Sequence, residues 1–504
     1  MGNIETASFD VMTVPLKGSN LIEASAGTGK TFSIAVMILR LILRQYSTAT
    51  TLVKEDTTPL YINQLLVVTF TTSAVAELED RVRKYIYIAE KYISSKAETK
   101  MQTASEFPFI VSIVELALLN GDKVQIERTL KDNLLLLDEV NIMTIHSFCQ
   151  STLNEFAIET RQLFGISLFT DTDNLLETEI NKFWRKYITT LDTFILRGLD
   201  LEKTKKNLKE VVKYHLDGKY YAYYEPSKNY SEIDSSEMWS NISDRVYEEK
   251  ESGLLTIETM LTDVTVKKAI ENSSATKRTK DKYISVLSDT KAFIDVYAED
   301  GGKYSSTKAK TSLPESLKLL LDAYITKYYN VEDYIQRLFF IDINNLAIQE
   351  ITKGYFHFLS ANNFMTYDDL IDKLHTAIKS SSSERLKEKL NDKYKAVFVD
   401  EFQDTDKKQY EIFYETFASN SILFLIGDPK QSIYGWRKAD LLTYFKARSQ
   451  VDKVYHMNVN YRSSESAVSA MNRFFKPVQD FDTFLYNDQV DGINYMPVET
   501  PTNS

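Results

Sequence analysis

A glycine-rich segment near the amino terminus contains the residue types that bind phosphate. It follows a short apolar run, opens a predicted helix and reads Ala24-Ser25-Ala26-Gly27-Thr28-Gly29-Lys30-Thr31. Ala24 stands where the strict pattern of a phosphate-binding loop has glycine. Gly27 and Gly29 would let backbone N–H groups turn toward phosphate oxygens. Lys30 would reach the β- and γ-phosphates, and the Thr31 hydroxyl would bind Mg²⁺. We therefore expect this segment to bind ATP and Mg²⁺, with a chance glycine-rich turn as the alternative.

Two adjacent carboxylates follow a second apolar run. Asp400 and Glu401 come directly after residues 396–399, which read Ala-Val-Phe-Val. Neighbouring acids on a surface are usually only solvated, but a carboxylate at the end of a buried strand needs a partner such as a cation. Asp400 could hold the metal while Glu401 polarises the attacking water. Gln431 stands just beyond a third apolar run, where its amide could sense the γ-phosphate.

An aromatic residue and a basic residue lie shortly after Gln431. Trp436 and Arg437 offer an aromatic face and a guanidinium, which suit stacking on an unpaired base and holding its backbone. A tryptophan that stood alone would more often be a core residue. Similarly, a lone histidine at a strand end, such as His146, is more often a packing residue than a contact.

Short apolar runs that end in polar residues predict the buried strands of a parallel sheet. Helical patterns lie between them, and this alternation predicts the α/β class. Because the carboxyl ends of parallel strands share one edge, the polar residues after each run would meet where ligands bind in such folds. The predicted strands occupy residues 21–22, 65–68, 142–145, 396–399 and 422–426, and examples of the helical patterns are residues 32–46 and 74–92.

A long stretch of chain separates the run before His146 from the run before Asp400. It is far longer than one crossover needs, so the sequence predicts an inserted domain. Its patterns are mostly helical, with amphipathic segments at residues 175–187 and 317–338. We place this insert at residues 151–359.

Composition limits the class of protein. The chain has 504 residues, 43% of them apolar and 26% charged, which is enough for roughly two to four domains. A formal net charge of −11 argues against a protein that coats nucleic acid through bulk electrostatics. Basic stretches at residues 276–282 and 303–310 could act locally, or could be solvated surface or loop. A single cysteine, Cys149, the lack of a secretory signal and the lack of a long apolar run predict a cytoplasmic protein without a membrane role.

Six segments resemble the motifs of the UvrD-like superfamily 1 DNA helicases and occur in the same order along the chain. Their residues are similar to those of the RecB group within that family. The order makes the resemblance more specific than any single motif. It covers residues 15–150 and 364–475, whereas the insert matches in position and helical character. The segments are residues 21–31, 66–71, 144–149, 400–405, 427–434 and 460–463.

The resemblance implies a RecA-like parallel sheet of the P-loop NTPase type with a large inserted helical domain. Residues 1–150 and 360–455 would form a discontinuous RecA-like ATP-binding domain, and residues 456–504 would start a second RecA-like domain. Arg462 would face the γ-phosphate across the cleft and stabilise charge in the transition state. The track for single-stranded DNA would be lined by Phe70, Thr71, Thr144, His146, Tyr434, Trp436 and Arg437.

By the same resemblance, the chain is expected to be the N-terminal motor portion of an ATP-dependent 3′–5′ DNA helicase of the RecB type, which is a subunit of exodeoxyribonuclease V. Its expected role is in double-strand break repair and recombination. Its partners would be single-stranded and end-containing double-stranded DNA, with RecC-like and RecD-like subunits in the full-length protein. Because the chain ends at Ser504, soon after Arg462, we expect a truncated protein with little ATP turnover of its own. An AddA-like or UvrD-like helicase is the near alternative. The alternative of another class is a truncated module that binds ATP, DNA or a partner without turnover.

Overall fold

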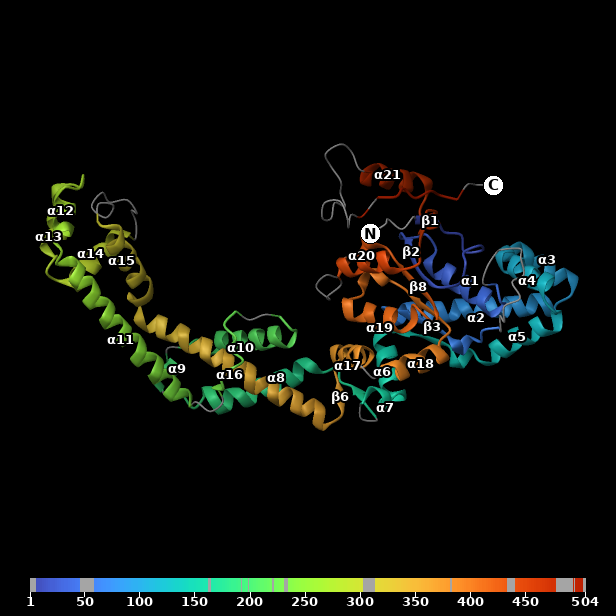
Figure 1. Cartoon of the computed structure of the whole chain (residues 1–504), viewed down its shortest axis with the longest axis horizontal. Coiled ribbons are helices and arrows are strands. Elements are labelled where there is room, and N and C mark those ends of the chain that lie inside the picture. The colour runs from blue at the N-terminus through green and yellow to red at the C-terminus, as the bar shows by residue number, and fades with distance from the viewer. Residues whose placement is uncertain are drawn as a thin grey trace. The chain divides into compact units, whose positions relative to one another are not determined.

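The computed structural model of the chain divides into two compact units, drawn as a ribbon in Figure 1. The first unit is made of Met1–Thr170 and Asn363–Ser504, and the second is Asp171–Asn362. The structure describes residues 6–45, 59–161, 165–191, 193–197, 199–219, 222–230, 234–301, 313–380, 383–432, 440–476, 493 and 495–501.

A seven-stranded sheet forms the centre of the first unit. Its strands pair only in parallel, in the order β1-β9-β2-β8-β7-β3-β4. This confirms the predicted α/β class and its parallel sheet. The sequence pattern predicts neither β1, which has only three residues, nor β9, in which lysine and histidine interrupt the apolar run. The strands are β1 (Thr6–Ser8), β2 (Ser19–Ala24), β3 (Leu65–Thr69), β4 (Asn141–Thr144), β7 (Ala396–Val399), β8 (Ile422–Gly427) and β9 (Lys453–Met457).

Helices cover both faces of the sheet, as the ribbon in Figure 1 shows. Alternate residues of each central strand enter two different hydrophobic cores: Leu65 and Val67 pack into one, and Leu66 and Val68 into the other. Such burial on both faces explains the continuous apolar runs of the sequence. One core is built with α1 (Lys30–Ile42), α2 (Thr72–Ser94), α4 (Pro108–Asn120) and α5 (Lys123–Leu135), and the other with α6 (Ile145–Glu155), α17 (Tyr367–Lys379), α18 (Glu384–Lys393), α19 (Lys407–Phe417) and α20 (Leu441–Gln450).

Helices are the only regular secondary structure among the described residues of the second unit, which has a hydrophobic core of its own. The amphipathic segment at residues 317–338 is divided between two helices, α15 and α16, which are separated at Tyr329 and Asn330. Residues 277–282 form part of a helix instead of a loop, because the Thr276 hydroxyl accepts from the Thr279 N–H and caps it. The basic stretch at residues 303–310 lies outside the described residues. The helices are α8 (Thr172–Phe183), continued by the π-helical turn η3 (Trp184–Ile188), then α9 (Thr193–Arg197), α10 (Leu201–Leu216), α11 (Ser235–Leu261), α12 (Val264–Glu271), α13 (Lys277–Ser285), α14 (Thr290–Gly301), α15 (Glu315–Tyr328) and α16 (Val331–Ala361).

The chain leaves and re-enters the first unit through a short parallel pair, β5 (Ser167–Leu168) and β6 (Phe364–Met365). The Ser167 N–H donates to the Asn363 carbonyl at 3.1 Å, and the Phe169 N–H donates to the Met365 carbonyl at 2.9 Å. Both ends of the inserted unit are therefore fixed at one place on the first unit.

The bounds of the two compact units differ from those of the predicted domains. Residues 151–170 belong to the first unit because Leu153 and Phe156 pack into one of its cores. Strand β9 runs to Met457, so residues 456 and 457 are part of the seven-stranded sheet. The assignment of the residues that follow to a second RecA-like domain stays a prediction.

Arg40 is a buried cation on α1. Its Nη1 donates to the carbonyls of Val11 and Val14 at 2.8 and 2.9 Å, and its Nη2 donates to the Gln45 carbonyl at 3.2 Å. Burial lowers the pKa of Arg40 to about 10, and the charge of Asp10 opposes the shift, so the guanidinium stays charged at neutral pH. The side chain therefore ties the segment before β2 to the end of α1.

We expect Arg40→Leu to lower the free energy of unfolding by about 2–4 kcal/mol, because three carbonyls would lose their donor inside the protein. Urea denaturation measures the change. Arg83→Leu, on the 56% exposed side chain of α2, is the matched control and should change stability by about 0.5 kcal/mol or less. Equal effects of the two substitutions would show that Arg40 does not hold these segments together.

Candidate nucleotide and nucleic-acid site

The glycine-rich segment forms the turn between β2 and α1. Gly27 and Gly29 have φ values of 80° and 88°, the left-handed region that glycine adopts without strain. A Cβ on Gly27 would lie 2.8 Å from the Cβ of Arg462, so the residue also has no room for a side chain. The Thr28 hydroxyl donates to the Ser25 carbonyl at 2.7 Å and stabilises the turn. The segment therefore has the backbone shape that a phosphate-binding loop needs.

Lys30 and Glu401 form an ion pair across the sheet edge. Lys30 begins α1, after β2, and Glu401 follows β7, with β8 between these two strands. The Lys30 Nζ lies 2.7 Å from Oε2 of Glu401, and the two side chains are 13% and 34% exposed. Glu401 has a φ of 51°, a left-handed conformation that a residue with a side chain rarely adopts. Such strain is typical of functional sites, and here it occurs at the carboxylate that contacts Lys30.

Asp400 is a buried carboxylate at the end of β7. Burial raises its pKa to about 6; the adjacent Glu401 carboxylate adds to the rise, and Lys30 opposes it. One oxygen, Oδ1, accepts from the Glu401 N–H at 2.9 Å. A buried acid of this kind is stabilised when a cation binds it, so Asp400 fits the predicted metal role.

Gln431 lies in the short 3₁₀ turn η7 (Pro429–Gln431), just after β8. Its Nε2 donates to Oδ2 of Asp428 at 2.8 Å, and the Lys430 Nζ contacts Oδ1 of the same carboxylate at 2.8 Å. Asp428 in turn donates its backbone N–H to Oε1 of Gln403 at 3.0 Å. Gln431 is therefore part of a hydrogen-bonded network at the ends of β7 and β8.

Residues 458–463, which follow β9, pack directly against the glycine-rich loop. The Asn460 Nδ2 donates to the Ala26 carbonyl at 3.0 Å, and the Tyr461 N–H donates to the Gly27 carbonyl at 2.8 Å. The Asn460 Oδ1 accepts from the backbone N–H groups of Arg462 and Ser463, both at 2.9 Å. The backbone of Arg462 is thus fixed beside the loop, and its position facing the γ-phosphate across a cleft stays a prediction.

A second group of predicted residues lies at the ends of β3 and β4, which are neighbours in the sheet with Thr69 opposite Thr144. Phe70 follows β3. Thr71 and Thr144 are the N-caps of α2 and α6, and their hydroxyls accept from the third backbone N–H that follows each. His146 is half-buried in the first turn of α6. These four residues emerge at the same sheet edge as the glycine-rich loop.

Tyr367 is a residue of this second group that the sequence analysis missed. Its ring packs edge-on against His146, with 4.8 Å between ring centroids, and the residue is 46% exposed. Burial lowers the pKa of His146, while Asp368 and Asp406 oppose the shift, so the imidazole is neutral at pH 7. The capping box formed by Thr366 and Asp369 is the local signal that places Tyr367 at the start of α17.

Three other residues predicted to contact DNA, Tyr434, Trp436 and Arg437, lie outside the described residues. Two more functional candidates within the described parts of the chain are Gln403 and Asn460. Both lie in the motif segments, but the sequence alone predicts no function for either. Only their packing against the loop and the acidic pair identifies them.

The family model described as the UvrD/REP helicase N-terminal domain matches residues 6–452. The chain belongs to this family. It is 30% identical to the RecBCD enzyme subunit RecB of Escherichia coli (strain K12) over 98% of this chain and 40% of that protein. The same subunit of Buchnera aphidicola subsp. Baizongia pistaciae is 29% identical over 94% and 39%, and that of Haemophilus influenzae is 26% identical over 96% and 42%. The chain thus spans about two fifths of the length of these RecB relatives.

The UvrD/REP match covers β1 to β8, the inserted unit and α20. It therefore includes the glycine-rich loop, the acidic pair and Gln431, whereas Asn460 and Arg462 lie beyond it. RecB similarity extends over these last residues as well, since it covers 98% of the chain.

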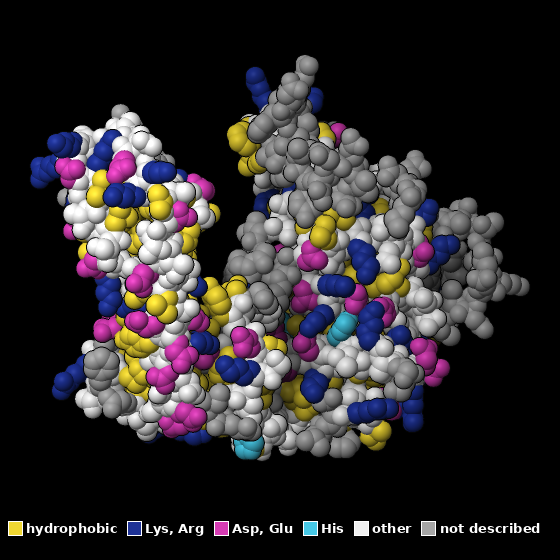
Figure 2. Space-filling model, turned by 60° about the vertical axis from the view of Figure 1, so that its left-hand side comes forward, with side chains coloured by type: hydrophobic (Ala, Val, Ile, Leu, Met, Phe, Trp, Pro, Cys, Tyr) yellow, Lys and Arg dark blue, Asp and Glu magenta, His cyan; other side chains and the backbone are white. Residues whose placement is uncertain are grey.

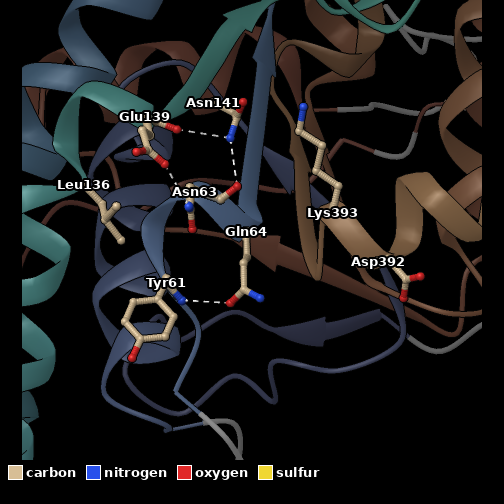
Figure 3. Close-up of a pocket in the computed structure, with 8 residues that line it drawn as sticks. All are labelled: Tyr61, Asn63, Gln64, Leu136, Glu139, Asn141, Asp392 and Lys393. Carbon is tan, nitrogen blue, oxygen red and sulfur yellow. Dashed lines mark hydrogen bonds between the residues drawn. The ribbon is translucent and has the colours of Figure 1, made fainter. Parts of the chain in front are cut away.

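A surface hollow at the opposite edge of the sheet is a different kind of feature (Figure 3). It lies where β3 and β4 begin, and its polar groups bind one another: the Asn141 Nδ2 donates to the Asn63 carbonyl at 2.9 Å, and the Asn63 Nδ2 donates to Oε2 of Glu139 at 3.0 Å. The Gln64 Oε1 accepts from the Tyr61 N–H at 3.0 Å. Ligands of UvrD-like sheets are expected at the carboxyl ends, so this hollow is not the nucleotide site.

Charged side chains of both signs are intermixed on the face of the molecule that Figure 2 shows. Among the described helices, none is long and apolar enough to cross a membrane.

The raised pKa of Asp400 has a measurable effect on stability. Its folded value of about 6 exceeds the ordinary value of 3.8, so the charged form weakens the fold as the pH rises between these two values. We therefore expect Asp400→Asn to be more stable than the parent chain by about 1–3 kcal/mol at pH 8, and by clearly less at pH 5. Urea denaturation at the two pH values measures this. A constant difference at both would rule out a perturbed Asp400.

Proposed function

We propose that this chain is the ATP-binding and single-stranded-DNA-binding motor portion of an ATP-dependent 3′–5′ DNA helicase of the RecB type. The observation that carries the proposal is the convergence of Lys30, Asp400, Glu401 and Gln431 at one edge of a parallel sheet. Membership of the UvrD/REP helicase family supports it.

In the proposed reaction each residue acts at one part of ATP. Residues 24–31 cradle the phosphates, with the Gly27 and Gly29 backbone turned by its positive φ and the N-terminus of α1 adding a favourable dipole. Lys30 leaves Glu401 for the β- and γ-phosphates. Glu401, released from that ion pair, orients and polarises the attacking water. Gln431 senses the γ-phosphate, and Arg462 stabilises charge that develops on the phosphoryl group.

Magnesium fits the same edge. Thr31 and the buried carboxylate of Asp400 would hold it, and it would neutralise charge on the β- and γ-phosphate oxygens. Within the described residues no three His, Cys, Asp or Glu side chains cluster closely enough to hold a metal alone. Mg²⁺ in such sites takes one or two protein ligands with phosphate oxygens and water, which matches this arrangement.

Single-stranded DNA would cross the neighbouring strand ends. Phe70 and His146 can stack on bases without reading their sequence, while Thr71 and Thr144 offer hydroxyls to the backbone. Tyr434, Trp436 and Arg437 would extend this track. Movement would follow from closure of the ATP cleft on nucleotide and its opening after hydrolysis.

The wider role is proposed from the RecB relatives, which are named as subunits of the RecBCD enzyme. It comprises double-strand break repair and recombination in the cytoplasm, on DNA ends, with RecC-like and RecD-like subunits. The 26–30% identity to RecB favours this assignment over an AddA-like or UvrD-like helicase. A module that binds ATP, DNA or a partner without turnover is the alternative that experiment must separate.

Lys30→Ala should weaken Mg-ATP binding about 10- to 150-fold, because a charge-assisted contact worth roughly 1.5–3 kcal/mol is lost. Isothermal calorimetry measures the affinity. Lys91→Ala, at an exposed lysine of α2, serves as the control and should leave the affinity unchanged. An unchanged affinity in Lys30→Ala would place the nucleotide elsewhere.

Hydrolysis distinguishes a motor from a binding module. Although we expect little steady ATP turnover from this chain, ATP bound to the parent chain should be hydrolysed faster in a single turnover than ATP bound to Glu401→Gln, by about 10²-fold or more, since the substitution removes the group that polarises water. An oligonucleotide should increase the parent rate. Single-turnover measurement keeps product release from limiting the rate. Equal rates in the parent and Glu401→Gln, with or without DNA, would support the module without turnover.

A further inference from the structure

Gln403 connects the acidic pair to the end of the neighbouring strand. It lies in the 3₁₀ turn η6 (Phe402–Asp404), just after β7, and is only 3% exposed. Its amide is used at both ends: Nε2 donates to Oε2 of Glu401 at 2.8 Å, and Oε1 accepts from the backbone N–H of Asp428 at 3.0 Å. One buried side chain therefore bridges the ends of β7 and β8.

The space around this amide is closely filled. A Cβ on Gly427 would lie 2.6 Å from Oε1 of Gln403 and 3.0 Å from its backbone N. The Ser432 hydroxyl donates to the Gln403 carbonyl at 3.2 Å. Because β8 approaches so closely, the amide has little room to rotate away from its two partners.

Glu401 depends on this bridge once Lys30 is withdrawn. Its Oε2 receives two donors, the Lys30 Nζ at 2.7 Å and the Gln403 Nε2 at 2.8 Å. In the proposed reaction a γ-phosphate takes Lys30, and of these two donors only Gln403 remains. A carboxylate that must align a water needs such a fixed donor to define its orientation.

At its other end the Gln403 bridge contacts Asp428, which lies in the same segment as Gln431, the predicted γ-phosphate sensor. Asp428 holds Gln431 and Lys430 through its carboxylate while its N–H holds Gln403. The predicted DNA residues Tyr434 and Trp436 follow this segment in the chain. A displacement of residues 428–432 must therefore move the donor that orients Glu401.

We propose that Gln403 is a positioning residue that couples the segment 428–432 to the carboxylate of Glu401. Its role is to hold Glu401 in the orientation for hydrolysis when that segment is in its DNA-bound position. The inference rests on the proposed ATP hydrolysis and adds to it the link through which DNA acts.

Two substitutions separate positioning from mere structural support. Gln403→Met keeps the size of the side chain and removes both hydrogen bonds. Gln403→Glu keeps an acceptor for the Asp428 N–H but removes the donor to Glu401. Gln409→Met is the matched control, since Gln409 is a buried glutamine of the same unit on α19.

We expect Gln403→Met to bind Mg-ATP within about threefold of the parent and to lose about 10- to 100-fold in single-turnover hydrolysis, with DNA stimulation abolished. Gln403→Glu should lose the DNA stimulation as well, because it lacks the donor to Glu401. Gln409→Met should retain the parent rate and stimulation.

Retained DNA stimulation in Gln403→Met would overturn the coupling role while leaving the proposed hydrolysis intact. Parallel losses of nucleotide affinity, turnover and thermal stability would show a structural role instead and would equally overturn it. If Gln403→Met does not fold, Gln403→Glu decides, and retained DNA stimulation in that variant would overturn the coupling role. A parent chain that hydrolyses no faster than Glu401→Gln would instead refute the proposed function.

Discussion

Parallel pairing of β2, β8 and β7 determines where the candidate catalytic groups leave the core. The register places Glu23 opposite Gly427 and Val399 opposite Leu425, so the ends of the three neighbouring strands are offset by only a few residues. Their side chains are buried on both faces, and a slip of one residue would exchange the two cores. The relative positions of the glycine-rich loop, the acidic pair and the turn after β8 are therefore set by the packing of the sheet.

Charges of opposite sign lie close together at this edge. Lys30 contacts Glu401, while Asp400 stays buried with a pKa of about 6. In the proposed reaction a phosphate would compete with Glu401 for Lys30, and a divalent cation would offset the buried charge of Asp400. Residues after β9 add a third constraint, because Asn460 and Tyr461 hold the loop through its carbonyls.

Much of this arrangement could be predicted from the sequence, because it depends on local patterns. Continuous apolar runs predict the buried strands, and Lys30, Asp400 and Glu401 stand directly beside them. Contacts between distant segments leave no such pattern: the packing of Arg462 on Gly27 and the bridge made by Gln403 depend on folding. The left-handed backbone of Glu401 likewise leaves no pattern in the sequence, since a glutamate gives no sign of a positive φ.

The β5–β6 pair has a consequence for folding kinetics. The first unit must join residues before 170 to residues after 363, which gives its sheet a high contact order. The inserted unit has its own core, in which α8 and α16 lie so close that a Cβ on Gly354 would meet the carboxylate of Glu179. If it folds first, it brings its two ends together and greatly shortens the loop that β5 and β6 must close. The folded insert then brings together the two parts of the first unit. Synthesis of the chain favours this order of folding, since the residues of the insert emerge before β6, β7 and β8.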